Sequence, residues 1–344
     1  SSPLFGTIVT MMSIVARSNV KFASGSILRQ RSTSLNYSLP QFVYLKINRS
    51  FALSSSAADE LLSHPSDLDA SPNSRGRVVC ITSGKGGVGK TTSAASFATG
   101  LAERGKKTAV VDFDVGLRNL DIHLGMERRV VFDMVHVLQG DCTLRQALIK
   151  DKRTPGLFML AASQTRDKDV LTMDGVGKML GGLSREFDYV VLDSPAGIES
   201  GARHAMYYAD DAIIVTNPEM SSCRDADKMV GFISARSRRA EEGSNEVTQT
   251  LLITRYDPER VAEEDSLSVS DMQELLGLPV VGVIPESRAV LQCTNTGSPV
   301  ISTGEIEPAA GAYADMVDRF LGEVDKPLRF ITPEPVSFFK RFFG

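Results

Sequence analysis

The sequence predicts one α/β domain built on a doubly wound, mostly parallel β-sheet. Short β-branched runs alternate with helical runs along the chain, and this alternation is typical of parallel strands joined by crossover helices. A glycine-rich segment, residues 83–92, lies between a predicted strand and the helix that follows it. Another apolar run ends in an aspartate at position 193. Together these features predict a ligand site at the carboxyl ends of the strands.

Residues 1–75 are predicted to be a disordered transit peptide and linker. Every charged residue before Asp59 is basic and serines recur throughout, which is typical of an organelle targeting segment. A disordered regulatory tail is the alternative, and composition alone does not separate a chloroplast from a mitochondrial signal. Because Pro65 and Pro72 fall in a polar stretch after this segment, the folded domain is predicted to span 76–325.

The glycine-rich segment has the composition of a phosphate-binding loop. The strand Val78–Ile81 precedes it, the helix 93–103 follows it, and the pattern G-x-x-x-x-G-K-[ST] is complete. Lys90 is predicted to reach the terminal phosphates, and Thr91 is predicted to place its hydroxyl on Mg²⁺. A glycine-rich turn without a ligand is the alternative. The predicted nucleotide-binding residues here are Gly84, Lys85, Gly86, Gly87, Val88, Gly89, Lys90, Thr91 and Thr92.

Two carboxylates follow the next predicted strand, residues 108–111. Asp112 and Asp114 stand at alternate positions, so their side chains face the same way at the end of the strand. Such a pair can hold the water of a Mg²⁺ ion and orient an attacking water molecule. Carboxylates that cap a turn are the alternative for either residue.

A second metal-binding aspartate is predicted farther along the chain. Two amphipathic helices between residues 128 and 151 and a strand at 157–161 come first, and then an apolar strand ends in Asp193. An apolar strand that ends in aspartate is the arrangement that holds Mg²⁺ through water in phosphoryl-transfer sites. Gly197, four residues on, is predicted to serve as a hinge or as a γ-phosphate amide.

The rest of the predicted domain repeats the same alternation. Further strands are expected at 212–216, 251–254 and 280–284, each closed by a polar or proline turn. Helices are expected at 225–239 and 312–321.

Lys85 lies near the start of the loop, where no lysine is needed to close it. Beside a polyphosphate it can supply a second positive charge to its own site or to a neighbouring subunit. The run Lys-Gly-Gly-Val-Gly-Lys-Thr-Thr resembles the deviant Walker A loop of the MinD/ParA/nitrogenase-iron-protein ATPases, a group of P-loop NTPases. The resemblance implies an ATP-dependent homodimer in which Lys85 crosses to the partner's nucleotide.

The resemblance also implies roles for other residues in a slow, Mg²⁺-dependent hydrolysis of ATP that a partner protein stimulates. Lys85 and Lys90 would contact phosphate oxygens, and Asp114 would position the hydrolytic water, so these three are the predicted catalytic residues. Thr91, Asp112 and Asp193 would lie at the metal. Asn217 and Pro285 would contact adenine.

The C-terminal segment 326–344 is predicted to be a linker followed by a membrane-binding amphipathic helix. At about 100° per residue its apolar side chains share one face and its two cations the other, as in an interfacial helix that meets anionic headgroups. Docking of this helix on its own domain or on a partner is the alternative. The predicted membrane-binding residues are Val336, Phe338, Phe339, Lys340, Arg341, Phe342 and Phe343.

Residues 77–344 resemble the MinD branch of the family, and the N-terminal extension departs from its bacterial pattern. The resemblance implies a plastid protein of the stroma, peripheral on the inner envelope membrane, that positions the FtsZ division ring; a mitochondrial location is the less favoured alternative. MinE-like and other division-site regulators are the implied partners. Asp225 and Asp227 fall on a surface that binds regulators in the family, although a solvated helix face also explains them.

Three other functions compete with this interpretation. The net charge of −4 argues against a nucleic-acid partner and thus against a ParA-type DNA-segregation ATPase. The four cysteines are scattered without a C-x-x-C pair, which argues against an iron–sulfur carrier of the same superfamily. A nucleotide-binding scaffold without turnover is the third alternative.

Overall fold

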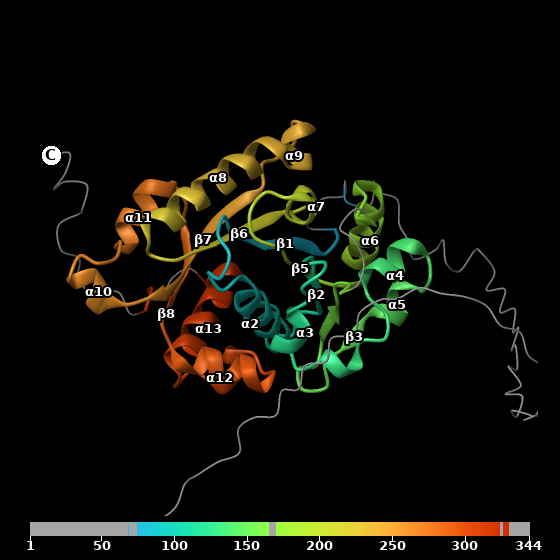
Figure 1. Cartoon of the computed structure of the whole chain (residues 1–344), viewed down its shortest axis with the longest axis horizontal. Helices are drawn as coiled ribbons and strands as arrows, with labels where there is room; N and C mark the ends of the chain where they lie inside the picture. The colour runs from blue at the N-terminus through green and yellow to red at the C-terminus, as the bar shows by residue number, and fades with distance from the viewer. Residues whose placement is uncertain (1–67, 69–73, 165–169, 324–325, 330–344) are drawn as a thin grey trace, which may run out of the picture. The chain divides into compact units, whose positions relative to one another are not determined.

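The computed structural model describes residues 68, 74–164, 170–323 and 326–329. Within this part of the chain, one sheet of eight strands has the order β3-β4-β2-β5-β1-β6-β7-β8 (Figure 1). All neighbouring strands are parallel except β3 and β4, which pair antiparallel at one edge. The strands are β1 Arg77–Thr82, β2 Thr108–Asp112, β3 Ile149–Lys150, β4 Leu157–Leu160, β5 Tyr189–Asp193, β6 Asp211–Thr216, β7 Thr248–Tyr256 and β8 Val280–Pro285.

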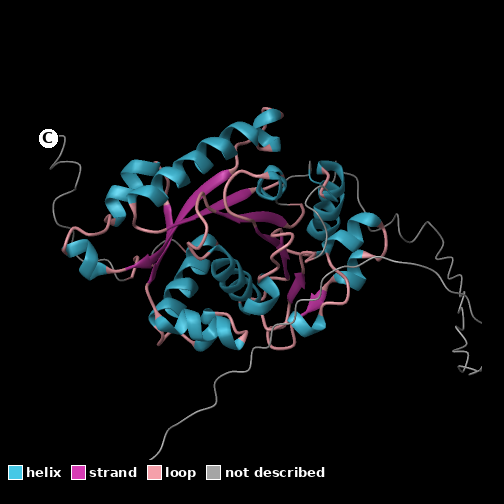
Figure 2. Cartoon of the chain, viewed as in Figure 1, coloured by secondary structure: helices cyan, strands magenta, loops and turns pink. Residues whose placement is uncertain are grey.

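Helices cover both faces of this sheet (Figure 2), and on each face the strand and helix side chains form one buried hydrophobic cluster. Alternate residues of β1 supply the two clusters, because Val78 and Cys80 face one side while Val79 and Ile81 face the other. The first cluster is covered by α4 Met134–Gln139, α5 Leu144–Ala147, α6 Met173–Glu186, α7 Ser200–Tyr207, α8 Met220–Arg236 and α11 Val269–Leu276. The second is covered by α2 Lys90–Glu103, α3 Leu120–His123, α12 Arg288–Thr296, the 3-10 helix η4 Val300–Thr303 and α13 Pro308–Phe320.

The remaining elements are short: the 3-10 helix η2 Glu127–Arg129, α9 Arg238–Glu241 and α10 Pro258–Ala262. None of the helices in the described ranges is long and apolar enough to cross a bilayer. The single-domain, doubly wound α/β fold predicted from the sequence is therefore confirmed for this part of the chain. The predicted boundaries at 76 and 325 stay predictions.

Several predicted elements differ in their bounds from the observed ones, and two helices show the physical reason. The helix expected at 225–239 begins at Met220 and ends at Arg236, after which Ser237 caps the separate helix α9. Ser237 accepts a hydrogen bond from the Ala240 N–H, which starts a new helix rather than continuing the old one. The helix expected at 312–321 begins earlier, at Pro308, where proline fits because the first helical N–H has no partner within the helix.

The segment 326–329 folds back along α13 after that helix ends. Lys326 forms ion pairs with Asp318 and Asp315, and Arg329 forms ion pairs with Asp315 and Glu305. Both helix carboxylates are more than nine-tenths buried. Glu305 precedes α13, so this segment returns from the carboxyl end of the helix toward its amino end. The predicted membrane-binding residues follow it and lie outside the described residues.

Candidate nucleotide site

The loop between β1 and α2 has the backbone of an anion cradle. Gly87 and Gly89 have φ angles of 77° and 96°, a region that favours glycine. A Cβ atom added to Gly86 or Gly87 would meet no heavy atom within 4 Å, so the described residues leave this part of the loop open. No side chain caps the first turn of α2 and no acidic residue lies in it. The free N–H groups and the helix dipole thus favour an anion at this position.

Gly84 is a glycine for a different reason. An added Cβ there would lie 2.2 Å from the backbone oxygen of Asp225 on α8. Close packing between the loop and α8 therefore requires this glycine. Its predicted contact with the nucleotide stays a prediction.

Lys90 brings a buried ammonium group to the centre of the loop. The side chain is 8% exposed, and its Nζ donates to Ser83 Oγ at 2.9 Å. Burial lowers the pKa of Lys90, while the nearby carboxylates of Asp193 and Asp114 raise it. Ser83 in turn donates to the Lys85 carbonyl at 2.7 Å, so one hydroxyl links the two lysines of the loop.

Asp193 stands at the carboxyl end of β5, beside the first turn of α2. It is 2% exposed, and its Oδ1 atom has no hydrogen-bond partner among the described residues. Burial raises the pKa of Asp193 well above its usual range, and the charge of Asp112 raises it further, whereas Thr91 and Lys90 lower it.

This cluster fits a divalent cation. Asp112, Asp114 and Asp193 gather near one ammonium group, that of Lys90, which leaves an excess of negative charge in a buried space. The Asp193 oxygen without a partner and the Thr91 hydroxyl are hard oxygen donors of the kind that Mg²⁺ prefers. The structure thus brings together Lys90, Thr91 and the three predicted aspartates.

Asp112 has a role that the sequence does not reveal. Its Oδ1 accepts from the Asp114 N–H at 2.8 Å, and its Oδ2 accepts from the N–H groups of Asn119 and Leu120, both at 3.2 Å. One carboxyl group therefore shapes the loop that carries Asp114 and starts α3. Burial raises the pKa of Asp112 to about 7. Its predicted place at the metal stays a prediction.

Lys85 points away from this cluster, toward the start of α8. Its Nζ lies 2.9 Å from Glu219 Oε2 and 3.4 Å from Ser221 Oγ. The lysine side chain is 41% exposed, so the ammonium lies on the surface of the chain.

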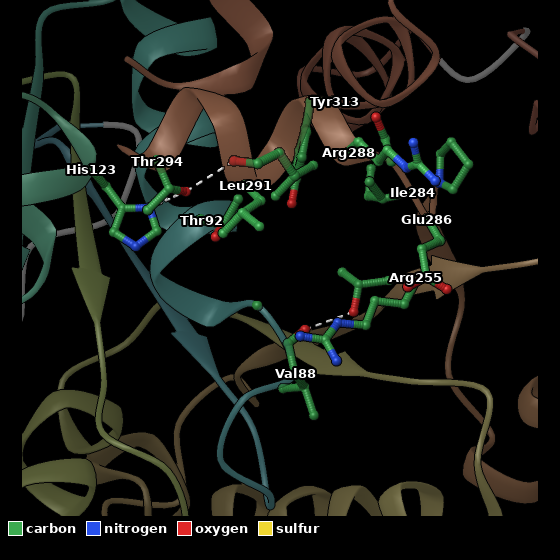
Figure 3. A pocket seen from close by; sticks show the side chains of 15 residues that line it. Val88, Thr92, His123, Arg255, Ile284, Glu286, Arg288, Leu291, Thr294 and Tyr313 are labelled. Carbon is green, nitrogen blue, oxygen red and sulfur yellow. Dashed lines mark hydrogen bonds between the residues drawn. The ribbon is translucent and has the colours of Figure 1, made fainter. Parts of the chain in front are cut away.

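Asn217 and Pro285 lie on the walls of two cavities, of about 480 and 530 Å³, that share Arg255 and Glu286. The larger cavity also reaches Gly89, at the end of the phosphate loop (Figure 3). A continuous lining therefore runs from the loop to the ends of β6, β7 and β8. The volumes suit a purine base with its sugar.

Two residues of this region were missed by the sequence analysis. The Thr254 hydroxyl lies 2.7 Å from the Val88 carbonyl oxygen and 2.9 Å from Asn217 Oδ1, which ties the phosphate loop to the end of β6. Arg255 has a φ of 54°, which is uncommon for a residue with a side chain. The polar turn that closes the predicted strand 251–254 was the available signal, but it does not show which side chain turns inward.

Comparisons with known proteins agree with this site. Residues 79–300 match the model of the CobQ/CobB/MinD/ParA nucleotide binding domain family. The chain is 58% identical over 270 residues to the septum site-determining protein MinD of Escherichia coli, an alignment that covers 78% of this chain and 99% of that protein.

Solved structures of similar proteins have the same fold. MinD of Aquifex aeolicus, alone and in a MinC:MinD complex, is matched with 39% and 38% identity, a TM-score of 0.64 in both cases, and coverage of 74% of this chain and 99% of that chain. MinD of Pyrococcus horikoshii, complexed with Mg-ADP, is matched with 27% identity and a TM-score of 0.62, over 72% of this chain and 97% of that chain. With the family model matched across the phosphate loop and the relatives covered almost end to end, this chain belongs to the MinD family.

Proposed function

We propose that this protein is an ATPase that places the division site of a plastid by dimerising on ATP and attaching to a membrane. The observation that carries the proposal is the pairing of an uncapped, glycine-lined helix start with the buried Lys90–Asp193 cluster. The Mg-ADP bound to the Pyrococcus horikoshii relative supports the same ligand here.

For hydrolysis, the loop N–H groups and Lys90 hold the β- and γ-phosphates, and they stabilise the charge that develops there. Thr91 and Asp193 would hold Mg²⁺, which neutralises charge on the phosphate oxygens when it is bound. Asp114 orients a water molecule toward the γ-phosphorus; water adds to phosphorus as the bond to the β-phosphate oxygen breaks, which yields ADP and phosphate. We expect basal turnover to be slow unless a partner protein repositions the residues around the γ-phosphate.

For dimerisation, a second copy of the chain is the proposed partner. Lys85 lies on the surface, where it pairs with Glu219, and exchange of that partner for a phosphate would let it contribute its charge to a nucleotide held by another copy. Regulators similar to MinE and MinC are proposed as further partners, because a MinC:MinD complex is among the matched structures.

For membrane attachment, the aromatic face of the C-terminal segment is proposed to enter the bilayer surface, while the two cations of the opposite face meet anionic headgroups. One short helix of this kind binds weakly, whereas two on a dimer gain from effective concentration. ATP would thus control attachment by controlling dimerisation. The basic, serine-rich N-terminal extension supports import into an organelle, and we propose the chloroplast, in the stroma at the inner envelope membrane.

Co-sedimentation of the full chain with anionic liposomes tests the proposal. We expect pelleting with ATP, little with ADP, and none for the double variant Phe339→Glu, Phe343→Glu. The matched control is Lys340→Gln with Arg341→Gln, which should weaken pelleting only at low salt. A protein that stays soluble with ATP on anionic lipid would contradict the membrane part of the proposal, while phosphate release tests the ATPase part separately.

A further inference from the structure

A buried ion pair lies at the amino end of β1, opposite the phosphate loop. Arg75 and Asp210 form a bidentate pair, with Nη1–Oδ2 and Nη2–Oδ1 distances of 2.8 Å and side chains only 4% and 2% exposed. Asp210 also accepts from the Val78 N–H at 2.8 Å and pairs with Arg239. Both oxygens of this carboxyl group are therefore fully used, as a buried charge requires.

Leu68 adds an apolar contact to this pair. Its side chain is 2% exposed and belongs to the first buried cluster. Its carbonyl oxygen accepts from Arg75 Nη2 at 3.1 Å and from Arg238 Nη2 at 2.8 Å. Leu68 thus contacts Arg75, which pairs with Asp210, and Arg238, the neighbour of Arg239 in the chain.

We call this set, Leu68 and Arg75 held by Asp210, Arg238 and Arg239, the N-terminal clasp. Leu68 and Arg75 precede residue 79, where the match to the family model begins, whereas Asp210, Arg238 and Arg239 lie within it, so the clasp joins the preceding segment to the matched domain. The clasp lies at the amino ends of β1 and β6, whereas the nucleotide residues lie at the carboxyl ends. Its contacts therefore serve the fold rather than the nucleotide site.

A targeting segment is removed by hydrolysis of one peptide bond, in which water supplies the new carboxylate and the new amino terminus. A cut after Leu68 would withdraw a buried leucine from the core and remove the carbonyl acceptor of two guanidinium groups. The cut product would then be less stable than a product that keeps Leu68.

We propose that the N-terminal clasp is retained in the mature protein, so that the peptidase that removes the targeting segment cuts on the N-terminal side of Leu68. The processing step rests on the proposed plastid location, whereas the clasp itself rests only on the contacts above.

The first experiment imports the full chain into isolated chloroplasts and identifies the N-terminal peptide of the shortened product by mass spectrometry. We expect the first residue to be Leu68 or an earlier one. A product that begins at residue 69 or later would overturn the proposal. A chain that is not imported or not shortened would contradict the plastid location, and the clasp is then decided by the second experiment.

The second experiment measures thermal unfolding of full-chain variants. Leu68→Ala and Arg75→Gln should each lower the Tm by about 4–10 °C. Matched controls on exposed side chains are Val131→Ala, 77% exposed, and Arg128→Gln, 94% exposed, which should shift the Tm by about 1 °C or less. If Leu68→Ala and Arg75→Gln unfold like their controls, the clasp is not a stabilising contact and the proposal fails.

Discussion

Two buried aspartates, at opposite ends of the central strands of the sheet, differ in how many hydrogen bonds their carboxylate oxygens accept. The carboxyl group of Asp210, which directly precedes β6, accepts hydrogen bonds from two guanidinium groups and one backbone N–H. Asp193, at the carboxyl end of β5, has an oxygen without a hydrogen-bond partner among the described residues and two other carboxylates nearby. The carboxyl group of Asp210 is satisfied within the chain, whereas Asp193 keeps an oxygen that can take a ligand such as a cation. Partner counts on a buried charge thus separate a structural carboxylate from a ligand-binding one.

The largest expected effect is a loss of stability at Asp210, at the amino ends of the strands. Asp210→Asn removes the negative charge from two buried guanidinium groups, which should lower the free energy of unfolding by about 3–5 kcal/mol. Chemical denaturation of the full chain measures this loss. A variant as stable as the unmodified protein would contradict a structural role for Asp210.

The next largest expected effect is on catalysis at Lys90, at the carboxyl ends of the strands. Lys90→Ala removes the ammonium group from the phosphate loop, and Mg²⁺-dependent phosphate release should fall about 10²–10³-fold or more. Lys107→Ala is the control, because this half-exposed lysine pairs with Glu186 away from the loop. Turnover that survives in the Lys90 variant would favour a different phosphate-binding group.

Asp193→Asn should have the opposite sign to Asp210→Asn in protein free of nucleotide and Mg²⁺. It removes a buried charge that repels Asp112 and lacks a full set of partners, so we expect the free energy of unfolding to rise by about 1–2 kcal/mol. The same variant should lose phosphate release. A fall in stability in chelator would show that Lys90 alone balances Asp193.

The cost of burying a charged carboxyl group at this site should also appear in the pH dependence of stability. The pKa of Asp112 is about 7 in the fold and near 3.9 in the unfolded chain. The native state therefore binds more protons between these values, and stability without Mg²⁺ should fall as pH rises from about 5 to about 7. Thermal unfolding in chelator at several pH values measures the slope, which Asp112→Asn should reduce by about one proton. An unchanged slope in that variant would assign the titration to another group.

The smallest expected effect concerns Lys85. Its pair with Glu219 is half exposed and contributes about 0.2–1 kcal/mol at most. Glu219→Gln should free the lysine and promote ATP-dependent dimerisation by up to about fivefold, as measured by analytical ultracentrifugation. Glu186→Gln, which breaks a similarly exposed pair with Lys107, is the control. A weaker dimer in the Glu219 variant would mean that the glutamate itself contacts the partner.

The sequence predicted most of the strands, because these depend on local patterns, and the structure brings the predicted Lys90 and Asp193 together. The run Val78–Ile81 and the aspartate at 193 each carry their signal within a few residues. The edge strand β3 has only two residues, which is too short for a periodic pattern. The pairs Lys85–Glu219 and Thr254–Val88 join residues 134 and 166 positions apart, and such contacts depend on how the strands are ordered in the sheet. Leu68 falls within the predicted linker, and its contacts, such as the hydrogen bond from Arg238 to its carbonyl oxygen, come from residues far along the chain.

If the C-terminal segment enters a bilayer as proposed, the return of residues 326–329 along α13 limits the orientations that the domain can take on it. Arg329 is held at Glu305 and Asp315, and the nearby Glu307 accepts from Ser287, in the turn after β8, at 2.5 Å. Phe339 is ten residues beyond Arg329, so even a fully extended chain carries it no farther than about 36 Å from that anchor. Because this connection starts beside α13, membrane attachment would keep the α13 side of the domain near the lipid and restrict rotation of the bound domain.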